Sequence, residues 1–195
     1  MKKIIRAVSV CSVLCMLLLQ LSGCGIGAGA GDLTAGLTPS ANPSKPLNDT
    51  FYTAQTAFSL ALFQQAAKED PKDLLISPLS VSVALAMAAN GAEGETAKEM
   101  LAVLGGKSKE ELNANLQRWI EQLTAKENAS MHLANSVWMR EIEGLNVKHS
   151  FLQSNVDHFG AGVFSRPFDQ KTVKEVNQWV KENTDGMIPS ILQEL

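Results

Sequence analysis

The sequence predicts an α+β domain in which helices outnumber strands. Six stretches between residues 48 and 185 carry apolar residues at helical spacing, and most are bounded by capping or turn residues. Only 131–139, 161–168 and the short run 74–76 have the pattern of a strand. This order, mainly helices with few strands and no internal repeat, is typical of the α+β class.

The first predicted helix begins at Asn48 or Asp49, either of which can cap it, and ends at residues 70–71, where a proline follows an aspartate. Its apolar residues fall along one face, as expected for a helix that packs on a core with one side. These residues are Phe51, Ala54, Phe58, Ala61 and Leu62.

The stretch from residue 74 to Gly91 raises the most specific expectation. The run 74–76 is too short to stand alone, so it is expected to join a sheet built from other segments. Ser77 is the expected cap of the next helix, with Pro78 at the first position, where a missing N–H costs nothing. Apolar residues without any charge then cover all sides up to Gly91, the expected left-handed terminus. Such a helix is expected to be enclosed by other elements.

Shorter signals predict the remaining helices. Capping boxes at Thr96–Glu99, Ser108–Glu111 and Thr172–Glu175 are each expected to start a helix. The first of these helices is expected to end at residues 105–106 and the last at residues 185–186, because both pairs contain a glycine suited to a helix terminus.

Two longer strands are predicted in the second half of the chain. Segment 131–139 has apolar residues on both faces, which indicates a strand covered on both sides. Segment 161–168 is the second strand and is stopped by Pro167. Leu152, Val156 and Phe159 have the spacing of a short helix between the two strands.

The first 23 residues have the features of a signal peptide. Lys2, Lys3 and Arg6 form a basic start, and an apolar run follows over 7–19. The next residues, LSGC, resemble the bacterial lipobox, which implies cleavage before Cys24 and lipidation of Cys24. The alternative is an ordinary secretory signal (1–23) followed by an incidental cysteine.

Residues 24–47 are predicted to be a flexible tether. They are mainly Gly, Ala, Thr, Ser and Pro, and such a segment buries too little apolar surface to order itself. Diacylated Cys24 would hold the domain on the outer side of a bacterial membrane, as an extracytoplasmic, surface or periplasmic lipoprotein. Cys11 and Cys15 leave with the signal peptide, so no disulfide is expected in the mature chain.

The charge of the chain argues against a nucleic-acid partner. Without Lys2, Lys3 and Arg6, 14 basic residues remain against 20 acidic ones, a formal charge of −6. A surface that binds phosphates needs clustered Lys and Arg, and no such cluster follows Arg6.

The sequence contains no motif of an enzyme or of a metal site. No nucleophile elbow, P-loop, dinucleotide fingerprint or zinc-protease motif occurs. Ser77 beside Pro78 is better explained as a helix cap than as a nucleophile. The remaining candidates are three glutamates and three histidines. Two of the glutamates flank a helix start, where negative charge is favoured, and the histidines have no partner at metal-ligand spacing. These residues are Glu93, Glu95, Glu99, His132, His149 and His158. We therefore expect no enzymatic activity, no cofactor and no metal.

Three blocks of the sequence together resemble the serpin family. ISPLSVSVALAMAANGAEGET (76–96) resembles its short strand and buried small-residue helix. HLANSVWM (132–139) resembles its central strand, and VNQWVKENTDGMI (176–188) resembles the helix across the front of its main sheet. The resemblance covers about Phe51 to Leu195. Asp73 and Met187 depart from the usual Asn and Lys of the family, which leaves the expected fold intact.

The resemblance implies a serine or cysteine protease inhibitor. In serpins a target protease attacks an exposed reactive loop and forms an acyl-enzyme, and the cleaved loop then inserts as a strand into the main sheet. It also implies that the hydroxyls of Ser77 and Ser80 lie under the place where that sheet opens, in the shutter region. A helix cap and an ordinary first-turn serine are equally good explanations for these two residues.

The resemblance further implies that 48–195 is the amino-terminal part of a serpin domain. It contains the first helices and strands of the main sheet and stops before the reactive loop, so the domain is expected to be incomplete. Residues 25–195 alone are then expected to be molten or aggregated, because strand edges lack partners. A non-inhibitory or remnant serpin-like lipoprotein that acts as a binding or scaffold module is the alternative. A solute-binding lipoprotein would need strand–helix–strand repeats, which are absent.

Overall fold

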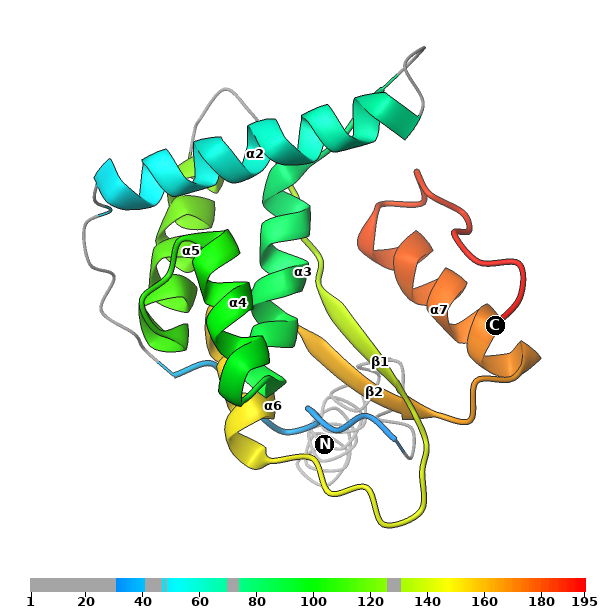
Figure 1. Cartoon of the computed structure of the whole chain (residues 1–195). Coiled ribbons are helices and arrows are strands. Elements are labelled where there is room, and N and C mark those ends of the chain that lie inside the picture. The colour runs from blue at the N-terminus through cyan, green and yellow to red at the C-terminus, as the bar shows by residue number, and fades with distance from the viewer. Residues whose placement is uncertain (1–30, 41–46, 48, 70–73, 126–130) are drawn as a thin grey trace, which may run out of the picture. The chain divides into compact units, whose positions relative to one another are not determined.

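Six helices and two strands make up the described part of the chain (Figure 1). The computed structural model describes residues 31–40, 47, 49–69, 74–125 and 131–195, all within the unit Gly31–Leu195. The elements are α2 (Asp49–Glu69), α3 (Pro78–Gly91), α4 (Gly94–Leu104), α5 (Lys109–Thr124), β1 (Ser136–Arg140), α6 (His149–Phe159), β2 (Gly162–Arg166) and α7 (Gln170–Asn183). The predicted α+β class is confirmed.

Helix α3 is the centre of the helical layer and contacts α2, α4, α5 and α6. Its side chains are small, so the neighbouring helices can approach it closely, and Val83 and Ala86 are fully buried. Buried polar bonds add to this packing: the Ser82 hydroxyl donates to Gln55 of α2 at 2.8 Å, and the Gln55 amide donates to the Leu104 carbonyl of α4 at 2.8 Å. The core cluster consists of Phe51, Val83, Ala86, Met87, Leu104, Leu112, Leu116, Phe159 and Ala161.

One face of α3 is open, where the sequence predicts a helix enclosed on all sides. The exposed residues recur at intervals of three or four and so form a stripe along one side of the helix. The residues on the other sides are buried or half-buried, so the prediction holds for those sides alone. This stripe, called the open face of α3 below, consists of Ser80, Ala84, Ala88 and Gly91.

The two strands form a parallel pair with register Ser136↔Gly162 to Arg140↔Arg166. Val137 packs against the core cluster, and Val163 opposite it is fully buried. On the other face the rings of Trp138 and Phe164 stack with centroids 4.4 Å apart. Helix α6 connects the two strands, with Leu152, Val156 and Phe159 buried as predicted.

Two of the three predicted strands are present but shorter than predicted, and the third is absent from the described residues. Residues 131–135 are outside β1, and β1 is half-buried rather than covered on both sides. Segment 74–76 is not a strand, and Leu75 is 96% exposed. The reason is the same in both cases: strand geometry needs a hydrogen-bonded neighbour, and the described residues offer one only alongside β1 and β2.

Two of the three predicted capping boxes are wrong and one is right. Ser108 caps α5 by accepting from the Glu111 N–H at 3.2 Å. Helix α7 instead begins after Asp169, whose carboxylate accepts from the Thr172 N–H at 2.9 Å, since a carboxylate three residues earlier is the better acceptor. Helix α4 begins at Gly94, where φ is +62°, so Thr96 lies inside its first turn.

Helices α3 and α4 terminate in different ways. Gly105 ends α4 in the left-handed conformation as predicted, and a Cβ there would lie 2.1 Å from the Cβ of Ala54. Gly91 is the last residue of α3, but it is not left-handed, and the chain becomes extended at Ala92. The Lys109 ammonium group satisfies this helix end by donating to the carbonyls of Asn90 and Ala92 at 3.3 and 2.5 Å.

Residues 31–40 lie against β2 and α6, where the sequence predicts part of a flexible tether. Their backbone pairs with β2 at Val163 and Ser165, and Asp32 and Phe164 form an antiparallel bridge. This part of the predicted tether is therefore attached to the folded domain. Residues 1–30 and 41–46 lie outside the described residues, so the signal peptide and the rest of the tether stay predictions.

Candidate functional site at the start of helix α3

Ser77 and Ser80, the two predicted shutter residues, lie side by side at the start of α3. The Ser77 oxygen accepts from the Ser80 N–H at 3.4 Å, and the two hydroxyl oxygens are 2.8 Å apart. Both side chains are exposed. Pro78 occupies the first helical position, so the predicted cap is confirmed. The hydroxyl of Ser77 therefore stabilises the helix end and remains open to a further hydrogen bond from outside.

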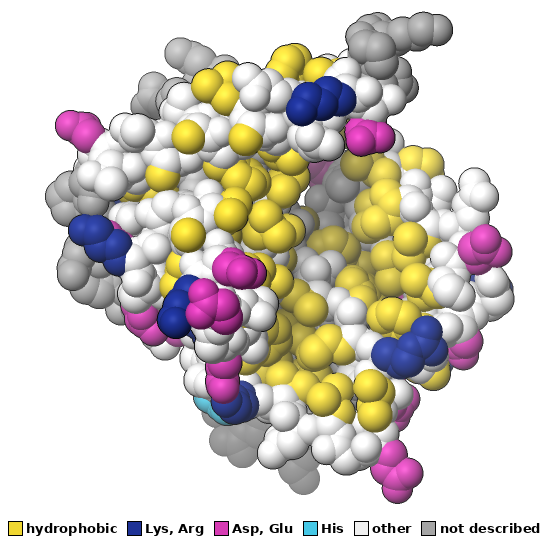
Figure 2. Space-filling view, viewed as in Figure 1, with side chains coloured by type: hydrophobic (Ala, Val, Ile, Leu, Met, Phe, Trp, Pro, Cys, Tyr) yellow, Lys and Arg dark blue, Asp and Glu magenta, His cyan; other side chains and the backbone are white. Residues whose placement is uncertain are grey.

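The open face of α3 continues this site along the helix. Figure 2 shows hydrophobic side chains gathered on the face between the helices on the left and α7 on the right, with few charges among them. A shallow depression of about 240 Å³ lies where α3 meets α4. Its lining residues are Leu85, Glu99, Met100, Val103 and Leu104. A surface of this kind is suited to an apolar protein partner rather than to a polar small molecule.

Helix α7 is joined to the strands by a half-buried ion pair that sequence reasoning missed. The Arg166 guanidinium at the end of β2 donates to the Glu175 carboxylate of α7 at 2.5 Å. The same guanidinium lies 5.7 Å from the centroid of the Phe164 ring, which stacks on Trp138. Charge and cation–π attraction act on one side chain, so they hold α7 next to the strand pair.

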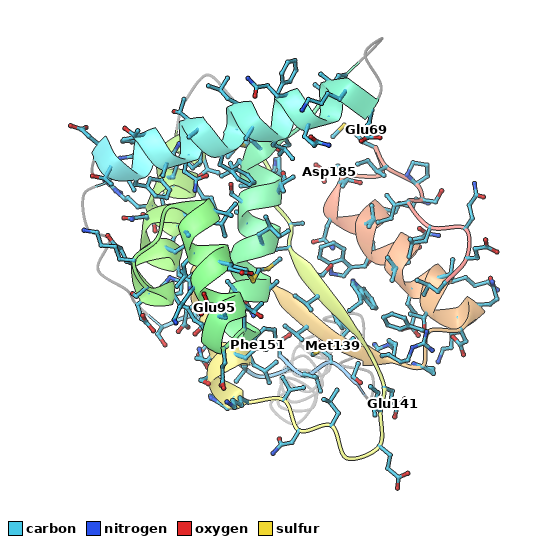
Figure 3. All side chains as sticks on the ribbon, viewed as in Figure 1. Glu69, Glu95, Met139, Glu141, Phe151 and Asp185 are labelled. Carbon is cyan, nitrogen blue, oxygen red and sulfur yellow. The ribbon has the colours of Figure 1, made fainter. Side chains whose placement is uncertain are left out.

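A buried amide cluster joins α3 to α5 and α6 and was also missed. The Asn90 amide donates to Asn155 at 3.0 Å, and the Asn113 amide donates to Asn90 at 2.8 Å. Asn155 is fully buried, and Asn113 is 3% exposed. The sequence signal was an asparagine on the buried side of each of two amphipathic helices. Phe151 of α6 packs close to Gly91 at this end of α3, beside the start of α4 that carries Glu95 (Figure 3).

Two of the candidate catalytic residues, Glu93 and Glu95, form ion pairs at the surface. Glu93 pairs with Lys148, which lowers the pKa of the Glu93 carboxyl mainly through their hydrogen bond, and Glu95 pairs with Lys98 at 3.0 Å. Across the described ranges, no group of His, Cys, Asp or Glu side chains could hold a metal ion. Over the same ranges, no helix combines the length and hydrophobicity of a membrane span. Cys24, the predicted lipidation site, lies outside the described residues.

The family of the chain follows from its similarity to known proteins. The serpin (serine protease inhibitor) family model matches residues 53–195. The chain belongs to the serpin family. This is a family of serine protease inhibitors rather than of enzymes, and its match to residues 53–195 confirms the resemblance carried by the three sequence blocks.

Serpins of known sequence and structure show which part of the domain is present. Leukocyte elastase inhibitor A of Mus musculus is 33% identical over 146 residues, which are 72% of this chain and 38% of that protein. Human neuroserpin is 33% identical over 66% of this chain and 32% of its own length. The crystal structure of the thermophilic serpin tengpin in the native state matches with a TM-score of 0.77 and 36% identity, over 84% of this chain and 42% of that one. The chain thus spans about 40% of a serpin and corresponds to the amino-terminal part of the domain, as predicted.

The half-buried His158 generates a prediction on pH. Burial lowers the pKa of His158 below its ordinary value of about 6.5, although the Asp157 charge acts in the opposite direction. A depressed folded-state pKa means that the unfolded chain binds the proton first. The stabilising contribution is therefore complete above about pH 6.5 and is lost as the pH falls below it.

We expect an NMR titration of this imidazole to give a pKa below about 6.5. The free energy of unfolding of the wild-type chain should fall more steeply between pH 7 and 5 than that of His158→Gln. Gln117, whose amide oxygen is 2.7 Å from Nδ1, is the hydrogen-bond partner in the neutral state. A pKa at or above the ordinary value would show that burial does not outweigh the Asp157 charge and would contradict this account of the ring's surroundings.

Proposed function

We propose that this chain is the amino-terminal part of an inhibitory serpin that traps a serine or cysteine protease. The observation that carries the proposal is the open face of α3, uncharged and made of small residues, with the paired hydroxyls of Ser77 and Ser80 at its start. Small side chains let sheet strands slide over such a face, and short hydroxyls can exchange hydrogen bonds as the strands separate. Membership of a protease inhibitor family supports the same function.

In this proposal the chain supplies the support for a movable sheet. Strands β1 and β2 are its first members, and the outer edge of β1 is free of a strand partner among the described residues. Further strands and the cleaved reactive loop would extend the sheet over the open face of α3. Ser77 and Ser80 would then bond to the strands that part during insertion, which is the role proposed for the shutter region.

We also propose that the domain is held on the outer face of a bacterial membrane through lipidated Cys24. The support is the order of sequence signals: a basic start, an apolar run and the LSGC box. Two acyl chains supply the stable anchoring that one chain does not.

A non-inhibitory serpin-like lipoprotein is the second candidate. The observation that favours it is the exposed and uncharged open face of α3, a surface suited to a protein partner. In that case the open face of α3 would bind a partner without trapping a protease.

A protease-trapping assay separates the two candidates. The protein expressed from its own gene, with any coding sequence that follows the Leu195 codon, is incubated with a panel of serine and cysteine proteases. We expect a complex with at least one of them that survives boiling in detergent, because the acyl-enzyme bond is covalent. The same protease with its nucleophile blocked beforehand should give no complex. A stop codon directly after Leu195, or cleavage without any complex, would favour the binding module.

Metabolic labelling with palmitate tests the anchor independently. We expect the wild-type protein to be labelled and to sediment with membranes, and Cys24→Ser to lose both properties. Cys15→Ser is the matched control, because this cysteine lies in the predicted signal peptide and should leave labelling unchanged. An unlabelled wild-type protein in the soluble fraction would support the ordinary secretory signal instead.

A further inference from the structure

Strand β2 has two edges, and β1 covers only one of them. In a parallel pair the backbone groups of alternate residues point toward the neighbour. Gly162 and Arg166 face β1, since the Gly162 N–H donates to the Asn135 carbonyl and the Arg166 carbonyl accepts from the Glu141 N–H. Val163 and Ser165 therefore point their backbone groups away from β1. An open edge of this kind is a template for pairing with another chain.

Residues 31–34 satisfy this outer edge. The Leu33 N–H donates to the Val163 carbonyl at 2.8 Å, and the Ser165 N–H donates to the Gly31 carbonyl at 2.7 Å. The Val163 N–H donates to the Thr34 hydroxyl at 3.2 Å. Val163 is 0% exposed, so without these partners its N–H and carbonyl would be buried and unpaired.

The contacts depend on particular residues in a segment of low complexity. The Asp32 carboxylate accepts from the N–H and the hydroxyl of Thr34 at 2.9 and 2.8 Å, which orients that hydroxyl toward Val163. Gly31 has φ of +107°, and a Cβ there would lie 2.5 Å from the Ser165 carbonyl oxygen. Only glycine fits at this position.

A second set of bonds attaches the end of the segment to α6. The Ser40 N–H donates to the Asp157 carboxylate at 2.8 Å, and the Gln153 amide donates to the Thr38 carbonyl at 3.0 Å. Burial raises the pKa of Asp157, but hydrogen bonds from Ser40 and Gln153 outweigh it, and the net pKa is lowered. The segment is thus bonded at both ends, to β2 and to α6.

We propose that residues 31–40 form an intramolecular strap that closes the outer edge of β2 and keeps it from pairing with a second copy of the chain. The occupant of this edge is the strap itself. The proposal concerns the described contacts alone and does not depend on protease inhibition or on lipidation.

Hydrogen exchange with Gly31→Ala and Gly36→Ala tests the strap. Both glycines have positive φ, but a Cβ at Gly36 would meet nothing within 4 Å, so Gly36→Ala is the matched control. We expect the amides of Leu33, Val163 and Ser165 to exchange at least about tenfold faster in Gly31→Ala than in Gly36→Ala or wild type. Slow exchange of Leu112 and Leu116, which are fully buried in α5, reports that the variant remains folded.

Thr34→Val provides a second and milder variant. It keeps the side-chain volume and removes the acceptor of the Val163 N–H, so the Val163 amide should exchange faster while α5 is unchanged.

The concentration at which light scattering rises should be at least about threefold lower for Gly31→Ala than for Gly36→Ala, because the freed edge adds a pairing surface. Rapid exchange of Ser165 in wild type, or equal exchange in both glycine variants, would overturn the strap. Equal scattering with a released strap would overturn its edge-closing role.

Discussion

The packing of four helices against α3 is the constraint on which the rest of the structure depends. Val83 and Ala86 are fully buried because small side chains let α2, α4, α5 and α6 approach together. Side-chain hydrogen bonds of Ser82 and Asn90 link α3 to α2 and α6. The remaining side of the helix is free of charge, and a second layer can therefore rest on it. The packing of the core and the proposed function therefore both depend on α3.

Local signals in the sequence predicted what local chemistry determines. The cap at Ser77, the cap at Ser108 and the left-handed end at Gly105 each involve residues within one helical turn, and all three are confirmed. The starts of α4 and α7 were wrong because a competing cap or turn lies a few residues earlier. The prediction of a strand at 74–76 was wrong because a strand needs a hydrogen-bonded neighbouring strand, which the local sequence pattern does not reveal.

In the candidate site, too, contacts within one helical turn could be predicted from the sequence, and contacts between distant segments could not. Ser77 and Ser80 are three residues apart in one helical turn, so their contact could be predicted. The Arg166–Glu175 pair depends on tertiary placement and could not. Residues 31–40 are the clearest case, since composition predicts a tether and long-range backbone bonds attach them to β2. With a lipid on Cys24, as proposed, only the seven residues before Gly31 would separate membrane and domain, a reach of about 25 Å rather than about 80 Å for the whole predicted tether.

Unpaired strand edges led to the expectation that residues 25–195 alone are molten or aggregated, whereas the packed core around α3 predicts cooperative unfolding. The placement of α3 is tested most directly by comparing Ala84→Glu with Ala86→Glu in this 195-residue chain. Ala84 lies on the open face and Ala86 is 0% exposed in the core, although the two are one residue apart on either side of Leu85. Unfolding by denaturant, followed by helical circular dichroism, should show Ala84→Glu within about 0.5 kcal/mol of wild type and Ala86→Glu less stable by roughly 4 kcal/mol or more. Equal losses for the two variants, or a larger loss for Ala84→Glu, would contradict the account.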